Sequence, residues 1–277
     1  MTTRAAVLAL LSSLLYGGGD FALGVASKAN SVFGTSCVFH GLGLPLTALV
    51  IVATRPTPPD SHALVAALLG GACLAAGGLL FVAALAKGRM GVIAPLTAVG
   101  AAGVPVVVGI VRGESPGPVA VAGMVAAAVG LLLVTTDRTQ TLSAGGIPEG
   151  IGAALGFGGF YVFLRAGESG GWWTVGISRA VVLVVTVVAA TLLGRRLSIP
   201  WRNTPVLVVA ATLATLAGAA FLFAQHQASL SLTAALASLY PAVTAVLAAT
   251  VLHERLTRRQ LAGSVIVLVA AACIAMP

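Results

Sequence analysis

Three ionisable side chains fall inside long apolar stretches of this 277-residue chain: Asp20, His40 and Arg179. A charge within the hydrocarbon of a bilayer is costly unless the group faces a cavity or a partner. Asp20 therefore predicts contact with a proton or with a substrate. Arg179 stays charged in proteins and needs a counter-ion, which would be Asp20 or a carboxylate of the substrate. His40 is a third candidate for this binding chemistry.

Each of these residues also has a purely structural interpretation. Asp20 would lie at the membrane interface if its helix ended early, at Gly17-Gly18-Gly19. Arg179 would extend from the first turns of its helix to the interface, as long basic side chains do. His40 would be a hydrogen-bonded packing residue. The residue types alone leave both interpretations open.

Other polar side chains in apolar segments are candidate cavity residues. Tyr16 and Tyr161 lie in glycine-rich stretches, where close helix packing turns rings inward. Gln225 stands near the end of another apolar run, and Tyr240 precedes Pro241. A proline within a helix lacks an N–H and bends the chain. Pro241 is therefore a candidate hinge, with a static packing kink as the alternative.

A compact charged corner, His253-Glu254-Arg255, ends the apolar run that begins near residue 230. Glu254 is expected to pair with Arg255 or with the arginines that follow it, at the membrane interface. Glu114 stands beside Arg112 in a similar loop and is given the same role. The alternative is that both loops are simply solvated and fix the topology.

The composition excludes a water-soluble protein. Hydrophobic residues make up 58% of the chain, charged residues only 8%, and the mean hydropathy is +1.07. Soluble domains carry about 25% charged residues. The net charge of +8 does not indicate nucleic acid, because the basic residues are scattered between apolar runs. The cysteines, lying singly in such runs, predict neither a disulfide framework nor a metal site.

Apolar runs long enough to cross a bilayer recur along the whole chain. A spanning helix needs about 20 mostly apolar residues. Charges, glycines and prolines divide the sequence into ten such runs, which predict an all-α integral membrane protein with about ten transmembrane helices. The expected spans are 5–26, 32–53, 63–86, 90–111, 117–135, 146–165, 173–193, 203–224, 230–252 and 258–276.

The second half of the chain repeats the first at an offset of 139 to 141 positions. The matching pairs are Tyr16 with Phe157, His40 with Arg179, Phe81 with Phe221, and Glu114 with Glu254. By the same offset Ala101 corresponds to Pro241. The halves 1–138 and 139–277 would each contain five spans. Because five is odd, the two halves must insert with opposite orientation, as inverted repeats, which are a feature of secondary transporters.

The stretch 238–270, "SLYPAVTAVLAATVLHERLTRRQLAGSVIVLVA", resembles the ninth and tenth helices of EamA-like transporters in the drug/metabolite transporter superfamily. The stretch 14–28, "LLYGGGDFALGVASK", resembles their first helix. The resemblance implies export or exchange of small metabolites such as amino acids through a central cavity. It also implies cytoplasmic termini, whereas the excess of Lys and Arg in the odd-numbered loops predicts termini outside the cytoplasm.

We therefore expect a multi-pass plasma-membrane secondary transporter that works by alternating access, with either proton coupling or exchange. Its expected partners are a small-molecule substrate and the lipid bilayer; it needs no cofactor, and it is a monomer or homodimer. The alternatives are an integral membrane enzyme and a drug efflux protein like the small multidrug-resistance proteins. An enzyme is disfavoured because the seven acidic residues are dispersed and no HExxH or nucleotide-binding GxxxxGK[ST] motif occurs.

Overall fold

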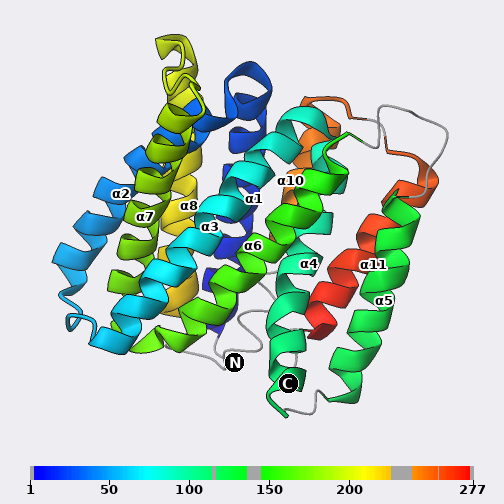
Figure 1. Cartoon of the computed structure of the whole chain (residues 1–277). Coiled ribbons are helices and arrows are strands. Elements are labelled where there is room, and N and C mark those ends of the chain that lie inside the picture. The colour runs from blue at the N-terminus through cyan, green and yellow to red at the C-terminus, as the bar shows by residue number, and fades with distance from the viewer. Residues whose placement is uncertain (1–2, 114–116, 136–144, 226–238, 255, 275–277) are drawn as a thin grey trace.

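The computed structural model describes residues 3–113, 117–135, 145–225, 239–254 and 256–274. Helices fill most of these ranges, and no strand occurs in them (Figure 1). The α-helices are α1 (Thr3–Ala29), α2 (Val32–Thr54), α3 (Ser61–Lys87), α4 (Met90–Val111), α5 (Pro118–Thr135), α6 (Ile147–Ala166), α7 (Trp172–Leu192), α8 (Thr204–Gln225), α10 (Tyr240–Val251) and α11 (Arg258–Ile274). Two short 3-10 turns, η1 (Glu168–Gly170) and η2 (Trp201–Asn203), precede α7 and α8.

Local sequence signals set several helix ends. The Ser31 hydroxyl accepts a hydrogen bond from the Gly34 N–H at 3.1 Å and begins α2. The Asp60 carboxylate accepts one from the Ala63 N–H at 2.7 Å and begins α3. Such caps satisfy N–H groups that the first turn of a helix leaves unpaired.

Seven described helices, α1 to α4 and α6 to α8, are long and apolar enough to cross a membrane. The other three in the described part of the chain, α5, α10 and α11, are shorter. The described helices follow the ten predicted spans, although α10 covers only the second half of the span 230–252. The expected all-α membrane fold is confirmed.

The contacts that join the two halves of the chain occur in equivalent pairs. α1 packs on α8 as α3 packs on α6, and α1 packs on α10 as α4 packs on α6. Likewise α2 packs on α8 as α3 packs on α7. These pairs are equivalent if α1 to α5 correspond, in order, to α6, α7, α8, α10 and α11. Two halves related by an internal duplication predict this arrangement.

Two close helix crossings between the halves, α1 with α10 and α6 with α4, occur at equivalent positions. A β-carbon on Gly17 would overlap Val243 and the carbonyl oxygen of Tyr240. A β-carbon on Gly158 would overlap Val104 and approach the carbonyl oxygen of Ala101. Ala101 is thus the structural counterpart of Tyr240, which corrects its expected match with Pro241 by one residue.

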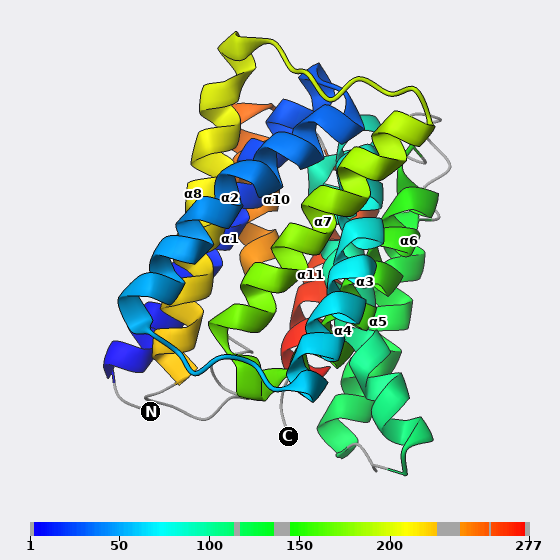
Figure 2. The ribbon, with the colours of Figure 1, turned by 60° about the vertical axis from the view of Figure 1, so that its left-hand side comes forward.

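Equivalent loops of the two halves lie at opposite ends of the bundle. The loop 193–203 lies at the upper end in Figure 2, whereas the loop 55–60 lies at the lower end, where α1 also begins. These names, upper end and lower end, are used below. Opposed loops are what an inverted pair of five-helix units predicts.

The hydrophobic core is concentrated toward the upper end. Leu85 lies two residues before the end of α3, and Met90 and Ile93 lie in the first turn of α4; all three side chains are completely buried. Leu207, also fully buried, lies in the first turn of α8, and Ala26 lies near the upper end of α1. We call these residues and their neighbours in the cluster the upper plug. It separates the middle of the bundle from the upper surface.

Candidate functional site

Arg179 is held between three helices. Its guanidinium Nη1 donates a hydrogen bond to the Thr215 hydroxyl on α8 at 3.2 Å. Thr215 in turn donates to the Ala211 carbonyl at 2.9 Å, which orients its oxygen. On α2, Gly43 leaves the space that the guanidinium occupies, because any β-carbon there would overlap Nη1. Within the described residues Arg179 forms no ion pair, so most of its five N–H donors stay available to a ligand.

Tyr16 is the residue that interacts with both charged groups. It is within electrostatic range of both Arg179 and Asp20. Its hydroxyl lies against Gly218 on α8, and its ring centroid lies 6.0 Å from that of Tyr240, tilted by 53°. Asp20 follows one helical turn later on α1, and it forms no ion pair with Arg179 within the described part of the chain.

Tyr161 faces these residues from the opposite wall. It lies within electrostatic range of Tyr16 and Asp20, and Tyr240 lies within range of all three. Yet α6 packs mainly on α3 and α4, not on α1. Tyr161 is 45% exposed, and Tyr16, Asp20 and Tyr240 are each partly accessible. These four side chains thus interact electrostatically while each keeps some accessible surface.

These side chains lie well inside the bundle. Asp20 stands nine residues before the end of α1, about 13 Å below its upper end at 1.5 Å per residue. Tyr240 begins α10, about 16 Å below the end of that helix. Arg179 stands seven residues after the start of α7, about 10 Å above its lower end. The interpretations of Asp20 and Arg179 as interfacial residues are therefore disfavoured.

His40 lies at the edge of this group. Its imidazole is 8% exposed, meets Phe39 edge-on at a centroid distance of 5.0 Å, and lies within electrostatic range of Arg179. Gly78 on α3 faces its Nε2, and Nδ1 has no partner among the described residues. No hydrogen bond of the imidazole occurs within the described residues, so the alternative of a hydrogen-bonded packing histidine gains no support there.

The remaining candidates divide into two groups. Glu114, Arg255 and the side chain of Gln225 lie outside the described residues. Pro241 lies in the first turn of α10, where a missing N–H breaks no helical hydrogen bond. Its expected kink would involve the carbonyl of Ala237, which is outside the described residues, so the hinge stays a prediction.

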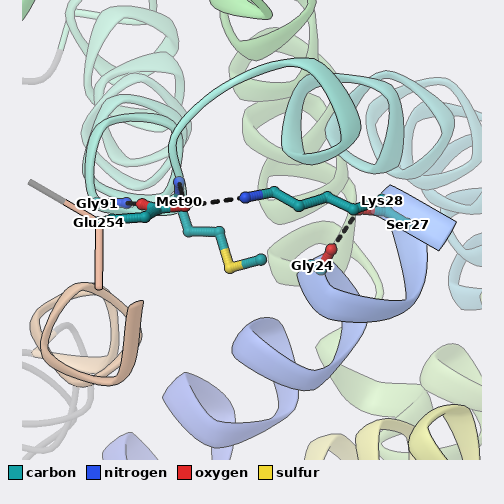
Figure 3. A network of polar contacts seen from close by, with 6 residues as sticks. All are labelled: Gly24, Ser27, Lys28, Met90, Gly91 and Glu254. Carbon is teal, nitrogen blue, oxygen red and sulfur yellow. Dashed lines mark hydrogen bonds and ion pairs between the residues drawn. The ribbon is translucent and has the colours of Figure 1, made fainter. Parts of the chain in front are cut away.

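Glu254 does form an ion pair, but its partner is Lys28 on α1, at 2.9 Å. Its carboxylate also faces the backbone N–H groups of Met90 and Gly91 at the start of α4, each at 3.4 Å (Figure 3). The expected pairing with Arg258 or Arg259 is therefore wrong, and the ion pair joins distant helices; Arg255 lies outside the described residues. A contact 226 positions apart in the chain leaves no signal in local spacing.

Sequence reasoning also missed Thr215 and Gly43, the two residues that hold Arg179. A threonine and a glycine inside apolar helices are common, and nothing in their spacing points to a distant arginine. Thr215 could be suspected of contacting Arg179 only once the offset between the halves had shown that α8 corresponds to α3.

Together, the fold and the site define a polytopic helical membrane protein with opposed charges and tyrosines at mid-depth. Residues 145–276 match the model of the EamA-like transporter family. Residues 145–276 of this membrane protein are thus similar to EamA-like transporters, as the resemblance implied. The match covers the second of the two predicted halves.

Comparison with solved structures gives the same fold. One crystal structure aligns with a TM-score of 0.65 over 99% of this chain and 97% of its own length. The two sequences are 15% identical, so this likeness concerns the fold alone. No curated protein matches the sequence.

Proposed function

We propose that the protein is a secondary carrier of the plasma membrane that moves a small zwitterionic metabolite, such as an amino acid, by alternating access. The observation that carries the proposal is the pair of opposite charges, Arg179 and Asp20, which both interact with Tyr16 but form no ion pair with each other in the described residues. Two unpaired opposite charges at mid-depth are costly when empty. A zwitterion satisfies both at once.

Each group has a defined role in this proposal. The Arg179 guanidinium binds the carboxylate of the substrate, for which its planar donors are well suited. The Asp20 carboxylate binds the ammonium group, or a proton when the site is empty. The rings of Tyr16, Tyr161 and Tyr240 form walls around the rest of the solute, and a ring face also favours a cation.

The match of residues 145–276 supports transport over catalysis, because the matched family is one of transporters. The other transport candidate is efflux of cationic drugs, which the three tyrosines and Asp20 would suit. Arg179 speaks against it, because an unpaired guanidinium repels a cationic solute within a medium of low dielectric constant.

Counterflow in proteoliposomes tests the proposal. Vesicles loaded with an unlabelled amino acid should accumulate the same labelled amino acid without ATP, and a screen across neutral, acidic and aromatic amino acids names the best one. Accumulation of a cationic dye in its place, with no amino-acid exchange, would support drug efflux. Formation of a chemically altered product would indicate an enzyme.

The mode of coupling is tested separately. If Asp20 carries a proton, Asp20→Asn retains exchange of substrate but loses uptake driven by a pH gradient. If gradient-driven uptake survives the substitution, the proton-carrying role of Asp20 is wrong, and exchange is the mode of transport.

A further inference from the structure

A compact polar junction closes the upper end of the bundle at the point where three helices meet. Figure 3 shows the Lys28 side chain reaching from the end of α1 toward the Glu254 carboxylate, which lies against the start of α4. The same carboxylate faces two backbone N–H groups of α4 at 3.4 Å. A carboxylate is favoured at a helix N-terminus by the unpaired N–H groups and the helix dipole. Glu254 therefore ties the end of α10 to both α1 and α4.

The junction lies directly over the upper plug. Met90, whose N–H faces Glu254, is completely buried, and its thioether fills the space that Gly24 leaves on α1 (Figure 3). Behind it, the Ser264 hydroxyl donates to the Gly91 carbonyl at 3.1 Å, and Leu256 packs against Gly91. Polar and apolar contacts thus hold the start of α4 in place at the upper end of the bundle.

The junction also joins the two halves of the chain. Lys28 and the start of α4 belong to the first half and Glu254 to the second. Among the described residues one other ion pair occurs, between Lys87 on α3 and Glu149 on α6, and it too joins the halves at the upper end. The two pairs differ in environment: the side chains of Lys28 and Glu254 are 37% and 10% exposed, and those of Lys87 and Glu149 are 59% and 22% exposed.

We propose that Glu254, with Lys28 and the first N–H groups of α4, forms a gate that closes the central site toward the upper end. The proposal rests on the proposed function, since a gate is needed only if the site opens to each end in turn. Opening the upper end requires α1, α4 and α10 to separate there, and this movement must break all the contacts of Glu254. The Lys87–Glu149 pair lies to one side and more in solvent, where an ion pair contributes little.

Thiol labelling tests the gate without any substrate. The parent protein has Cys37, Cys73 and Cys273 replaced by alanine and carries Ala26→Cys, a position in the upper plug that is 3% exposed. Its reaction with a water-soluble maleimide is followed in purified protein. With Glu254→Gln we expect labelling about tenfold faster, because loss of the charge shifts the population toward the upper-open state. Lys28→Met should act in the same direction, and the matched control Glu149→Gln should stay within about twofold of the parent.

The gate would be overturned if Glu254→Gln and Lys28→Met both labelled at the parent rate. It would equally be overturned if Glu149→Gln accelerated labelling as much as Glu254→Gln, since that would show general loosening of the upper end. Thermal unfolding of each variant shows that the folded protein is being compared, and Lys28→Met replaces Glu254→Gln if the latter does not fold. Failure of the proposed function is distinct: labelling would respond as expected while no metabolite exchanged in counterflow.

Discussion

The two halves of this protein share a backbone arrangement but differ in the chemistry they place on it. At the crossing of α1 and α10, Gly17 lies against Val243 and the Tyr240 carbonyl; at the crossing of α6 and α4, Gly158 lies against Val104 and the Ala101 carbonyl. The geometry is the same, because a glycine is needed wherever two helix backbones approach this closely. The side chains around the two crossings are not the same.

At several equivalent positions the two halves carry different side chains. With offsets of 139 to 141 positions, Asp20 corresponds to Tyr161 and Arg179 to His40, and Tyr240 corresponds to Ala101. The acid comes from the first half and the guanidinium from the second. If the halves arose by duplication, as predicted, divergence at a few positions gave the proposed site its two opposite charges.

The strongest test of this comparison replaces each member of the pair Arg179 and His40 by glutamine in turn. Arg179→Gln removes the charge that would bind the substrate carboxylate, so we expect counterflow to fall by about 100-fold or more, as for loss of a charged hydrogen-bonding partner in a buried site. His40→Gln should cost less than about tenfold. Equal losses in the two variants would show that the halves contribute alike and that Arg179 is not the anchor.

The second test concerns Asp20 and its counterpart Tyr161. Asp20→Asn is expected to weaken the binding of an amino acid by about tenfold, since it removes a charge but keeps the shape. Tyr161→Phe, which keeps the ring, should change binding by about threefold or less. Binding is measured by tryptophan fluorescence or by thermal stabilisation of the purified protein. If Tyr161→Phe weakened binding more than Asp20→Asn, the ammonium group of the substrate would bind the Tyr161 phenol and not the Asp20 carboxylate.

The third test breaks the similarity of the two crossings. Gly17→Ala and Gly158→Ala each force a β-carbon into the facing helix, and overpacking of this kind costs about 1–3 kcal/mol. We expect both variants to lower the temperature of thermal unfolding by similar amounts. Gly103→Ala, where no atom lies within 4 Å of the added carbon, is the control. A destabilisation confined to one crossing would mean that the halves are packed differently.

The smallest expected effect concerns the placement of Arg179. Gly43→Ala displaces the guanidinium, and Thr215→Ala removes its hydrogen bond, so each should weaken substrate binding by about three- to tenfold. Gly41→Ala is the matched control on the same helix, because the nearest atom to its added carbon is 4.0 Å away. If Gly41→Ala and Gly43→Ala behaved alike, the loss would reflect α2 itself and not the position of Arg179.

The sequence predicted the helices well and the contacts of individual polar groups poorly. The spans follow from hydropathy and from breaks at charges, glycines and prolines, signals that act within a few residues. The site residues Asp20, Arg179, Tyr16, Tyr161 and Tyr240 were also expected, because a polar group in an apolar helix stands out. Their mutual arrangement was not, and the one-residue difference between Ala101 and its expected match shows how quickly an offset loses accuracy.

Glu254 illustrates the limit most clearly. Its neighbours in the sequence are arginines, and local spacing therefore assigned it to them, whereas the folded chain places it on Lys28 and on the start of α4. The offset between the halves did predict that the walls of the site would come from both, but not that Thr215 and Gly43 would hold the guanidinium.

By itself, the amino-acid sequence determined that this chain is an all-α membrane protein with several long apolar helices, because burial of apolar length in lipid depends on composition along the chain. The ten spans and the two related halves stay predictions. Only the tertiary structure decided which charges meet, which remain unpaired and which end of the bundle is closed. Those outcomes depend on the relative rotation and depth of helices far apart in the chain, and a shift of one residue along a helix turns a side chain by about 100°.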